Sequence, residues 1–255
     1  MLYGLYLSAA GVIANSYRQD VIANNLANAE TVGFKKDITT FKERMTAAME
    51  QRQKTGWSDP LSEGLGGGIF AMPTLVDHSA GEFEATGNNM DAAIEGDGYF
   101  AVNENGQQRL TRNGQFMLDK DGNVILSSAN DAKVLDPSGQ PIKLEQGTAG
   151  STSISKDGYL YQNEKIVGQI GVFSVEDPTQ LQKQGGTLMS YPDQAGVKPM
   201  AGTLRSEFVE HANVDPATEL SALMDTQRQL EANANMIRYQ DQTLQRLVND
   251  VGKVG

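Results

Sequence analysis

The chain has 255 residues, enough for one large domain or two smaller ones, and 39% of them are hydrophobic. That fraction is somewhat low for a single compact globule and fits an elongated assembly subunit. The formal net charge of −11 argues against nonspecific binding to nucleic acids or anionic membranes, because both attract positively charged proteins. The absence of cysteine excludes disulfides and thiolate metal sites.

The first fourteen residues, MLYGLYLSAAGVIA, are apolar but do not have the pattern of a secretory signal. A signal peptide carries basic residues ahead of its apolar core, whereas the first basic residue here, Arg18, follows it. The run is also shorter than the roughly 20 apolar residues that cross a bilayer. We therefore expect a helix of the mature protein that is not inserted in a membrane.

This N-terminal helix is predicted to carry one apolar stripe. The stripe repeats at the three- and four-residue steps that place side chains on one helical face: Leu5, Ala9, Val12, Ala23 and Leu26. Only three residues among the first 34 are charged: Arg18, Asp20 and Glu30. A helix so poor in charge is expected to be surrounded by other protein.

A hinge is predicted where this helix ends. Asn24, Asn25 and Asn28 offer side-chain amides to backbone groups that a helix end leaves unpaired. Gly33 is free to adopt a positive φ in the turn that follows, and Phe34 would anchor the exit of the chain. An ordinary helix C-terminus followed by a loop explains the same spacing.

The next segment, Asp37 to Lys54, is more highly charged and is predicted to be helical or partly ordered, with Phe41, Met45 and Met49 on one face. The stretch from Trp57 to Gly68, WSDPLSEGLGGG, interrupts it with a proline and several glycines. We place the main domain boundary there.

From about Ile69 to Leu204 the sequence has the character of β-structure. Short runs of β-branched and aromatic residues alternate with turn dipeptides such as Asn105-Gly106, and no strand-helix-strand alternation occurs. The strands that we expect are 99–102, 116–118, 124–126, 159–161 and 166–175. The pattern favours an antiparallel sheet or a partly open barrel.

A long C-terminal helix is predicted from Pro216 to Val251. Asp215 precedes it as a capping side chain, and Glu219 lies in its first turn. Its apolar seam steps by three and four residues: Leu220, Leu223, Gln227, Leu230, Ala234, Ile237, Asp241, Leu244, Val248 and Val251. An amphipathic helix packed on its own domain fits this pattern as well as a coiled coil does. Some 36 residues would span about 54 Å, so the helix needs a partner along its length.

Several stretches of the chain resemble one protein family. The string NNLANAETVGFKK, from Asn24 to Lys36, resembles the N-terminal signature of the axial proteins of the bacterial flagellum, the rod and hook proteins. The stretches 90–102 and 110–123, MDAAIEGDGYFAV and LTRNGQFMLDKDGN, resemble the central motifs of the rod family of the FlgF and FlgG type. The C-terminal stretch 213–233, NVDPATELSALMDTQRQLEAN, resembles their last helix. Hook proteins are normally much longer, so the length favours a rod protein, of either the proximal FlgF or the distal FlgG type.

Together these features predict an α+β fold in which long N- and C-terminal helices pair as a coiled coil and flank a central antiparallel β-rich domain. The expected division is 1–68, 69–204 and 205–255. The resemblance implies a non-enzymatic structural subunit of the flagellar rod, exported by the flagellar type III apparatus without cleavage and located in the basal body. Its partners would be copies of itself, other rod and hook subunits, and the export apparatus. The expected assembly interface comprises Leu5, Val12, Asn24, Asn25, Leu26, Asn28, Gly33, Phe34, Leu220, Leu223, Leu230, Ile237, Leu244 and Val248.

The competing hypothesis is a secreted peptidoglycan-active hydrolase with helical appendages. Asp91, Glu95 and Asp97 would supply its acid and base. No cofactor or metal site is predicted, because His78 and His211 are isolated from each other and from any metal-ligand spacing.

Overall fold

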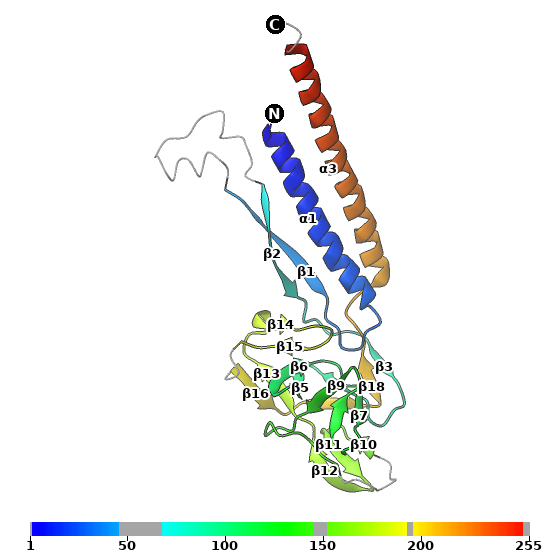
Figure 1. The fold of residues 1–255 in the computed structure, drawn as a ribbon. Coiled ribbons are helices and arrows are strands. Elements are labelled where there is room, and N and C mark those ends of the chain that lie inside the picture. Colours follow the sequence, from blue (N-terminus) through cyan, green and yellow to red (C-terminus); the bar gives the residue numbers. More distant parts are fainter. Residues whose placement is uncertain (1, 46–67, 145–151, 193–195, 252–255) are drawn as a thin grey trace. The chain divides into compact units, whose positions relative to one another are not determined.

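The computed structural model describes residues 2–45, 68–144, 152–192 and 196–251 (Figure 1). In these ranges the long elements are two α-helices, α1 (Leu2–Ala27) and α3 (Pro216–Val251), and a short 3-10 helix spans Pro178–Gln180. The strands are β1 (Asp37–Glu43), β2 (Ile69–Val76), β3 (Phe83–Ala85), β4 (Ala92–Glu95), β5 (Tyr99–Glu104), β6 (Gln107–Thr111), β7 (Phe116–Leu118), β8 (Val124–Leu126), β9 (Ala129–Val134), β10 (Thr152–Ile154), β11 (Tyr159–Gln162), β12 (Lys165–Gln169), β13 (Val172–Val175), β14 (Gln182–Lys183), β15 (Met189–Ser190), β16 (Val197–Met200), β17 (Thr203–Ser206) and β18 (Phe208–Glu210).

The chain divides into two compact units, which we call the helical unit and the β unit. The helical unit comprises Met1–Leu26, Asp37–Leu75 and Asp215–Gly255, and the β unit comprises Ala27–Lys36 and Val76–Val214. The helical unit therefore holds α1, α3 and the hairpin of β1 and β2. The division of the sequence at residues 68 and 204 stays a prediction.

The β unit is built on one large antiparallel sheet. Its strands follow the order β14, β15, β6, β5, β9, β8 and β7, and β13 joins it through β5 and pairs with β16 on its other side. Fully buried apolar side chains of this sheet, including Phe100, Val102 and Val124, pack with Leu160 of β11 and Leu204 of β17 into one core. A second cluster, around Tyr99, Leu110 and Met189, contains the side chains of the opposite face of β5.

Local sequence explains why these strands form where they do. Asn105 and Gly106 both have positive φ in the tight turn between β5 and β6, where Val102 lies opposite Arg109. The strands expected at 99–102, 116–118, 124–126 and 159–161 are confirmed. The run expected as one strand over 166–175 is two, because β12 pairs with β11 whereas β13 pairs with β5 and β16, and Gly171 lies between them. A Cβ on Gly171 would lie 2.7 Å from the carbonyl oxygen of Asp136.

The helical prediction for Asp37 to Lys54 is wrong over its described part. Residues 37–43 form strand β1, which pairs with β2, and the remainder beyond residue 45 lies outside the described residues. Tertiary contacts override the helical spacing, since Phe41 packs edge-on against Tyr17 of α1 at 6.4 Å between ring centroids. The guanidinium of Arg18 lies 5.1 Å from the centroid of the same Phe41 ring.

The predicted pairing of the terminal helices as a coiled coil is also wrong. The two helices lie side by side in the helical unit (Figure 1), but α1 approaches α3 through glycines. A Cβ added to Gly4 would lie 2.6 Å from Nε2 of Gln240, and one added to Gly11 would lie 2.8 Å from Nδ2 of Asn233. A coiled coil instead interdigitates apolar side chains from both helices.

The predicted seam of α3 consists of two rows of residues seven positions apart, and one of these rows was assigned to the wrong side of the helix. The row of Leu223, Leu230, Ile237 and Leu244 is half-buried. Its expected companion row is exposed, because Leu220 has 50% and Val248 has 71% of its surface accessible. The row on the other side is polar. Its Thr226 is buried, and its Asn233 and Gln240 lie against Gly11 and Gly4 of α1. Spacing by three and four residues does not choose between these two flanking rows.

The start of α3 agrees with its sequence signals. The Asp215 carboxylate accepts a hydrogen bond from the Ala217 N–H at 3.2 Å and one from the Thr218 hydroxyl. These hydrogen bonds lower the pKa of Asp215 below its usual value. The predicted bounds of this helix, Pro216 and Val251, are confirmed.

Candidate assembly interface

The helical unit exposes large apolar side chains that a folded domain normally buries in its core. Of the nineteen large apolar residues that are exposed in the described parts of the chain, fifteen belong to this unit. They are Tyr6, Leu7, Ile13, Ile38, Met45, Ile69, Phe70, Met72, Leu75, Leu220, Met224, Met236, Tyr239, Leu247 and Val248. Among the described residues its only buried apolar side chains are Ala14 and Ile22. Exposed apolar surface on this scale marks a site of protein interaction.

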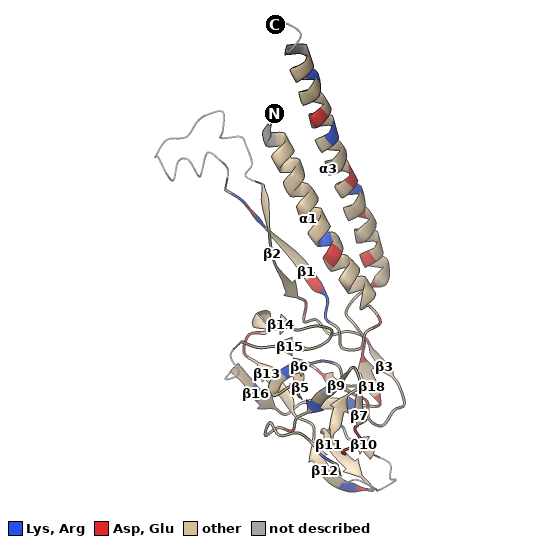
Figure 2. Ribbon diagram, in the orientation of Figure 1, with Lys and Arg blue, Asp and Glu red and all other residues tan. Residues whose placement is uncertain are grey.

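Charge is also sparse on α1. Figure 2 shows charged positions close together on one part of α1, whereas on α3 they recur along the coloured part of the helix. The two positions on α1 are Arg18 and Asp20. Charged side chains are thus rare on this helix, and that other protein surrounds it stays a prediction.

An apolar groove of about 270 Å³ lies in the helical unit between α1 and β2. Its walls are Tyr6, Ala9, Ala10, Ile13, Ala14, Ile69, Phe70 and Ala71. The strand on the β2 side of this groove was not among those predicted, although the sequence from Ile69 onward was expected to be β-rich. The nearly unbroken apolar run IFAMPTLV at Ile69–Val76 was the signal that would have located it.

The predicted asparagines at the end of α1 have different environments. Asn25 is buried, and its side chain exchanges two hydrogen bonds of 2.9 Å with the backbone N–H and C=O of Asp37. Asn28 is half-buried and bonds Thr31 through both its backbone and its side chain, whereas Asn24 is exposed. Asn25 thus stabilises the chain where it enters β1.

The two hinge residues are buried in the β unit. Gly33 has φ 70°, which confirms the predicted positive φ, and a Cβ there would lie 2.3 Å from the backbone nitrogen of Asn113. Phe34 is 2% exposed and packs with Ala212 and Val214. Close backbone approach and positive φ therefore both require glycine at position 33.

The other predicted interface residues are on the helices. Leu5, Val12 and Leu26 on α1 are half-buried, as are Leu223, Leu230, Ile237 and Leu244 on α3. Leu220 and Val248 are exposed. The helical unit thus brings together the residues of α1 and α3, while Gly33 and Phe34 belong to the β unit. That all fourteen contact other subunits stays a prediction.

Two of the three carboxylates of the competing hydrolase hypothesis, Asp91 and Glu95, have structural partners, and Asp97 lies between β4 and β5. Asp91 is 4% exposed and accepts hydrogen bonds from the Thr86 hydroxyl at 2.7 Å and from the Asn88 amide at 2.9 Å. Glu95 forms an ion pair with Arg205 at 2.7 Å, and hydrogen bonding to this guanidinium lowers the pKa of Glu95. A glycosidase needs a general acid with a raised pKa, which is the opposite shift.

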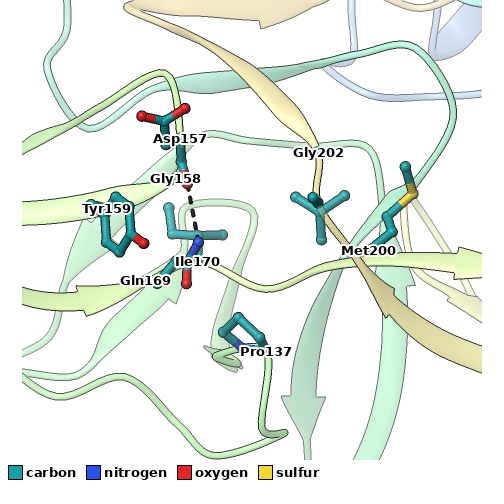
Figure 3. Close-up of a pocket in the computed structure, with 10 residues that line it drawn as sticks. Pro137, Asp157, Gly158, Tyr159, Gln169, Ile170, Met200 and Gly202 are labelled. Carbon is teal, nitrogen blue, oxygen red and sulfur yellow. Dashed lines mark hydrogen bonds between the residues drawn. The ribbon is translucent and has the colours of Figure 1, made fainter.

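A polar cavity of about 350 Å³ lies in the β unit beside β11 and β12 (Figure 3). Asp157 is the one charged residue in its lining, and its backbone C=O accepts a hydrogen bond from the Gln169 amide at 3.2 Å. The Ile170 N–H donates to the carbonyl of Gly158 at 2.8 Å, as Figure 3 shows. A single carboxylate does not make the acid and base pair of a glycoside hydrolase.

Metal binding and membrane crossing also bear on function. Among the described residues, no group of three or more His, Asp and Glu side chains is arranged to hold a metal ion. Within the same residues, neither helix combines the length and the apolar character that crossing a membrane requires.

Three family models match separate parts of the chain. Residues 5–35 match the flagella basal body rod protein family, residues 93–162 match the D1 domain of the flagellar hook protein FlgE/F/G family, and residues 205–250 match the flagellar basal body rod FlgEFG protein C-terminal family. The matches thus include α1 with the hinge, the central β-strands and α3.

Relatives match over nearly the whole length. The chain is 32% identical to the flagellar basal-body rod protein FlgG of Bacillus subtilis over 266 aligned residues, which include 98% of this chain and 99% of that protein. It is 30% identical to the rod protein FlgF of Caulobacter vibrioides, with 98% of each chain included. The flagellar hook-basal body complex protein FlhO of Bacillus subtilis is 24% identical over the full length of both. The chain therefore belongs to the flagellar basal-body rod protein family, as a structural subunit of the rod.

Proposed function

We propose that this subunit assembles with copies of itself and with other rod and hook subunits through its helical unit, and that the resulting axial tube transmits torque for motility. The concentration of exposed apolar side chains in the helical unit is the observation that carries the proposal. In water these side chains lack the burial that stabilises a domain, so neighbouring subunits supply it.

The contact surfaces on the two partners differ in this proposal. An apolar groove between α1 and β2 and the exposed apolar residues of α3 are distinct surfaces of one chain. Contacts between unlike surfaces that do not close into a ring generate helical filaments, as a tube requires. The fourteen predicted residues contribute to these contacts mainly through α1 and α3.

The subunit has no enzymatic role in this proposal. The family is structural, and two of the three carboxylates that the hydrolase hypothesis needed, Asp91 and Glu95, bond to neighbouring side chains. Transfer out of the cytoplasm would use the flagellar export apparatus without cleavage of the N-terminus. Both statements are testable by a muramidase assay and by the N-terminal sequence of the protein from isolated basal bodies.

The main test compares two substitutions at adjacent exposed positions of α3. Val248→Asp places a charge on an apolar side chain that is 71% exposed in the free subunit, and Asn249→Asp places the same side chain on a polar neighbour. The free energy of unfolding of both variants should lie within about 0.5 kcal/mol of that of the native protein, since substitutions of exposed residues rarely cost more. We expect Val248→Asp to abolish rod completion and swimming in a strain that lacks the native gene.

Asn249→Asp is the matched control and should swim normally. Burying an unpaired carboxylate in an interface costs several kcal/mol, which explains why only the apolar position should respond. Equal motility of the two variants would contradict the proposal that this part of α3 contacts other subunits.

A further inference from the structure

The chain passes between the two units at four places, and the β-unit residues beside three of them are bonded to one another. The crossings follow Leu26, Lys36, Leu75 and Val214. The three β-unit segments concerned are 33–36, which precedes β1, 77–82, which follows β2, and 209–214, which precedes α3. These segments are far apart in sequence, so their mutual bonds depend on tertiary structure alone.

The first set of bonds converges on the buried carboxylate of Glu210. Its Oε1 accepts hydrogen bonds from Lys35 Nζ at 2.5 Å and from the Gly81 N–H at 2.9 Å. Its Oε2 lies 3.4 Å from Arg112 Nη1. Lys35 Nζ also donates to the carbonyl oxygen of Ser79 at 2.7 Å. One carboxylate therefore connects all three segments to the central sheet.

These charges are removed from water. The side chains of Lys35 and Glu210 are both 0% exposed, and that of Arg112 is 5% exposed. Burial lowers the pKa of Lys35, and the Glu210 carboxylate opposes that shift. A buried ion pair tolerates the loss of one partner poorly, because the other charge is left without compensation.

The second set of bonds converges on the side chain of Asn213. Its Oδ1 accepts a hydrogen bond from the Lys36 N–H at 2.7 Å, and its Nδ2 donates to the carbonyl oxygens of Asp77 at 2.9 Å and Ser79 at 3.2 Å. The Asp77 N–H donates in turn to the carbonyl of Lys36 at 3.0 Å. Backbone pairing adds one more connection, from the Gly33 N–H to the carbonyl of Glu210 at 2.7 Å.

We infer that Glu210 and Asn213 make these three segments open and close as one element, which we call the crossing clamp. All of its members belong to the β unit: Gly33, Lys35, Lys36, Asp77, Ser79, Gly81, Arg112, Glu210 and Asn213. Separation of any one segment leaves a buried charge or the half-buried Asn213 amide without partners in the other two. The segments therefore cannot detach independently without that penalty.

The clamp deepens the proposed function and rests on it for its consequence. A subunit of a rotating rod carries load through the points at which the chain joins its two units. If the segments beside these points open together, load is shared among them and no single segment separates from the other two first. Glu210 and Asn213 are thus positioning residues for a load-bearing subunit.

Amide hydrogen exchange of the free, full-length protein tests the clamp. The reporters are the N–H groups of Gly33, Lys36 and Gly81, one bonded to the Glu210 backbone, one to the Asn213 side chain and one to the Glu210 side chain. Glu210→Gln should accelerate exchange of all three by a common factor of about 1,000, the fold-change expected when a buried pair loses one partner. Glu95→Gln, which removes an exposed ion pair of the same unit, is the matched control and should change none of them.

A reciprocal variant makes the test sharper. Asn213→Ala should accelerate exchange of the Gly81 N–H, although this amide does not bond Asn213. Likewise, Glu210→Gln should accelerate exchange of the Lys36 N–H, although this amide does not bond the Glu210 side chain. If each variant accelerates only the amide that it bonds directly, the segments open independently and the inference is wrong.

Swimming under load tests the consequence. In a strain that lacks the native gene, Glu210→Gln should swim like Glu95→Gln in dilute medium and fall behind it as viscosity rises. Equal swimming at every viscosity would overturn load sharing. Failure of the unsubstituted gene to restore any motility would instead contradict the proposed function, so the two failures are distinguishable.

Discussion

The two units of this subunit differ in how far they bury their large apolar side chains. The β unit buries most of the large apolar residues of its strands, with Phe100, Val102 and Leu160 fully inaccessible to solvent. The helical unit leaves most of its large apolar residues exposed and joins its two helices through glycines and amides. The β unit is therefore stabilised by its own core, and we propose that other subunits complete the burial of the helical unit. This comparison predicts that substitutions in the two units affect different measurements.

The largest effect is expected at the hinge. Gly33→Val should lower the free energy of unfolding by more than about 4 kcal/mol, because a β-branched residue resists φ 70° and its Cβ meets the backbone of Asn113. Chemical denaturation measures this loss. Gly106→Val is the control, since Gly106 also has a positive φ but has open space around its Cβ position. Similar losses in both variants would show that backbone conformation matters and close approach does not.

A buried ion pair should matter far more than an exposed one. Lys35→Met should cost about 3 to 5 kcal/mol, because it leaves the buried Glu210 carboxylate without its nearest cation. Lys198→Met removes an ion pair of the same 2.5 Å length whose partners, Lys198 and Glu176, are mostly exposed. Its melting temperature should be nearly unchanged. A large loss for Lys198→Met in thermal denaturation would contradict this difference between buried and exposed pairs.

Two leucines sharpen the comparison between the units. Leu204→Ala, at a residue of the β unit that is 1% exposed, should cost about 2 to 5 kcal/mol of stability. Leu220→Ala, at a residue of α3 that is 50% exposed, should stay within about 0.5 kcal/mol. Motility should respond to Leu220→Ala although the melt of the free subunit does not. A melt that falls equally in both variants would show that the helical unit buries Leu220 in solution.

The smallest effect is expected from acidification. Burial lowers the pKa of His78, and the nearby cations Lys35 and Arg112 add to the shift, whereas Asp77 opposes it. Because the folded protein then binds a proton less readily than the unfolded chain, stability should be present at neutral pH and decline as the pH falls below about 6.5.

Thermal melts between pH 7.5 and 5.5 measure this dependence. Nδ1 of His78 forms a 2.8 Å hydrogen bond with the Tyr99 hydroxyl, and burial of the ring disfavours its protonated form. His78→Gln should flatten the profile over this range. An unchanged slope in that variant would assign the pH dependence to other groups.

Local sequence signals determined several parts of this protein. The capping aspartate and first-turn proline defined the start of α3, and Asn105-Gly106 defined the turn between β5 and β6. Gly33 was identified because a turn that needs positive φ favours glycine. The family motifs at residues 24–36, 90–123 and 213–233 identified the rod family without any structure. These signals act over a few residues, so they survive in the sequence alone.

Only the tertiary structure decided which partners each segment has. Residues 37–43 became a strand because β2 and Tyr17 lie beside them, although their spacing also fitted a helix. The row of α3 that faces α1 was misassigned because a seven-residue spacing fits both Leu220 with Val248 and Asn233 with Gln240. The pairing of Lys35 with Glu210, separated by 175 positions, left no local pattern at all. Contacts between distant segments depend on how the whole chain folds, and no periodicity in one segment encodes them.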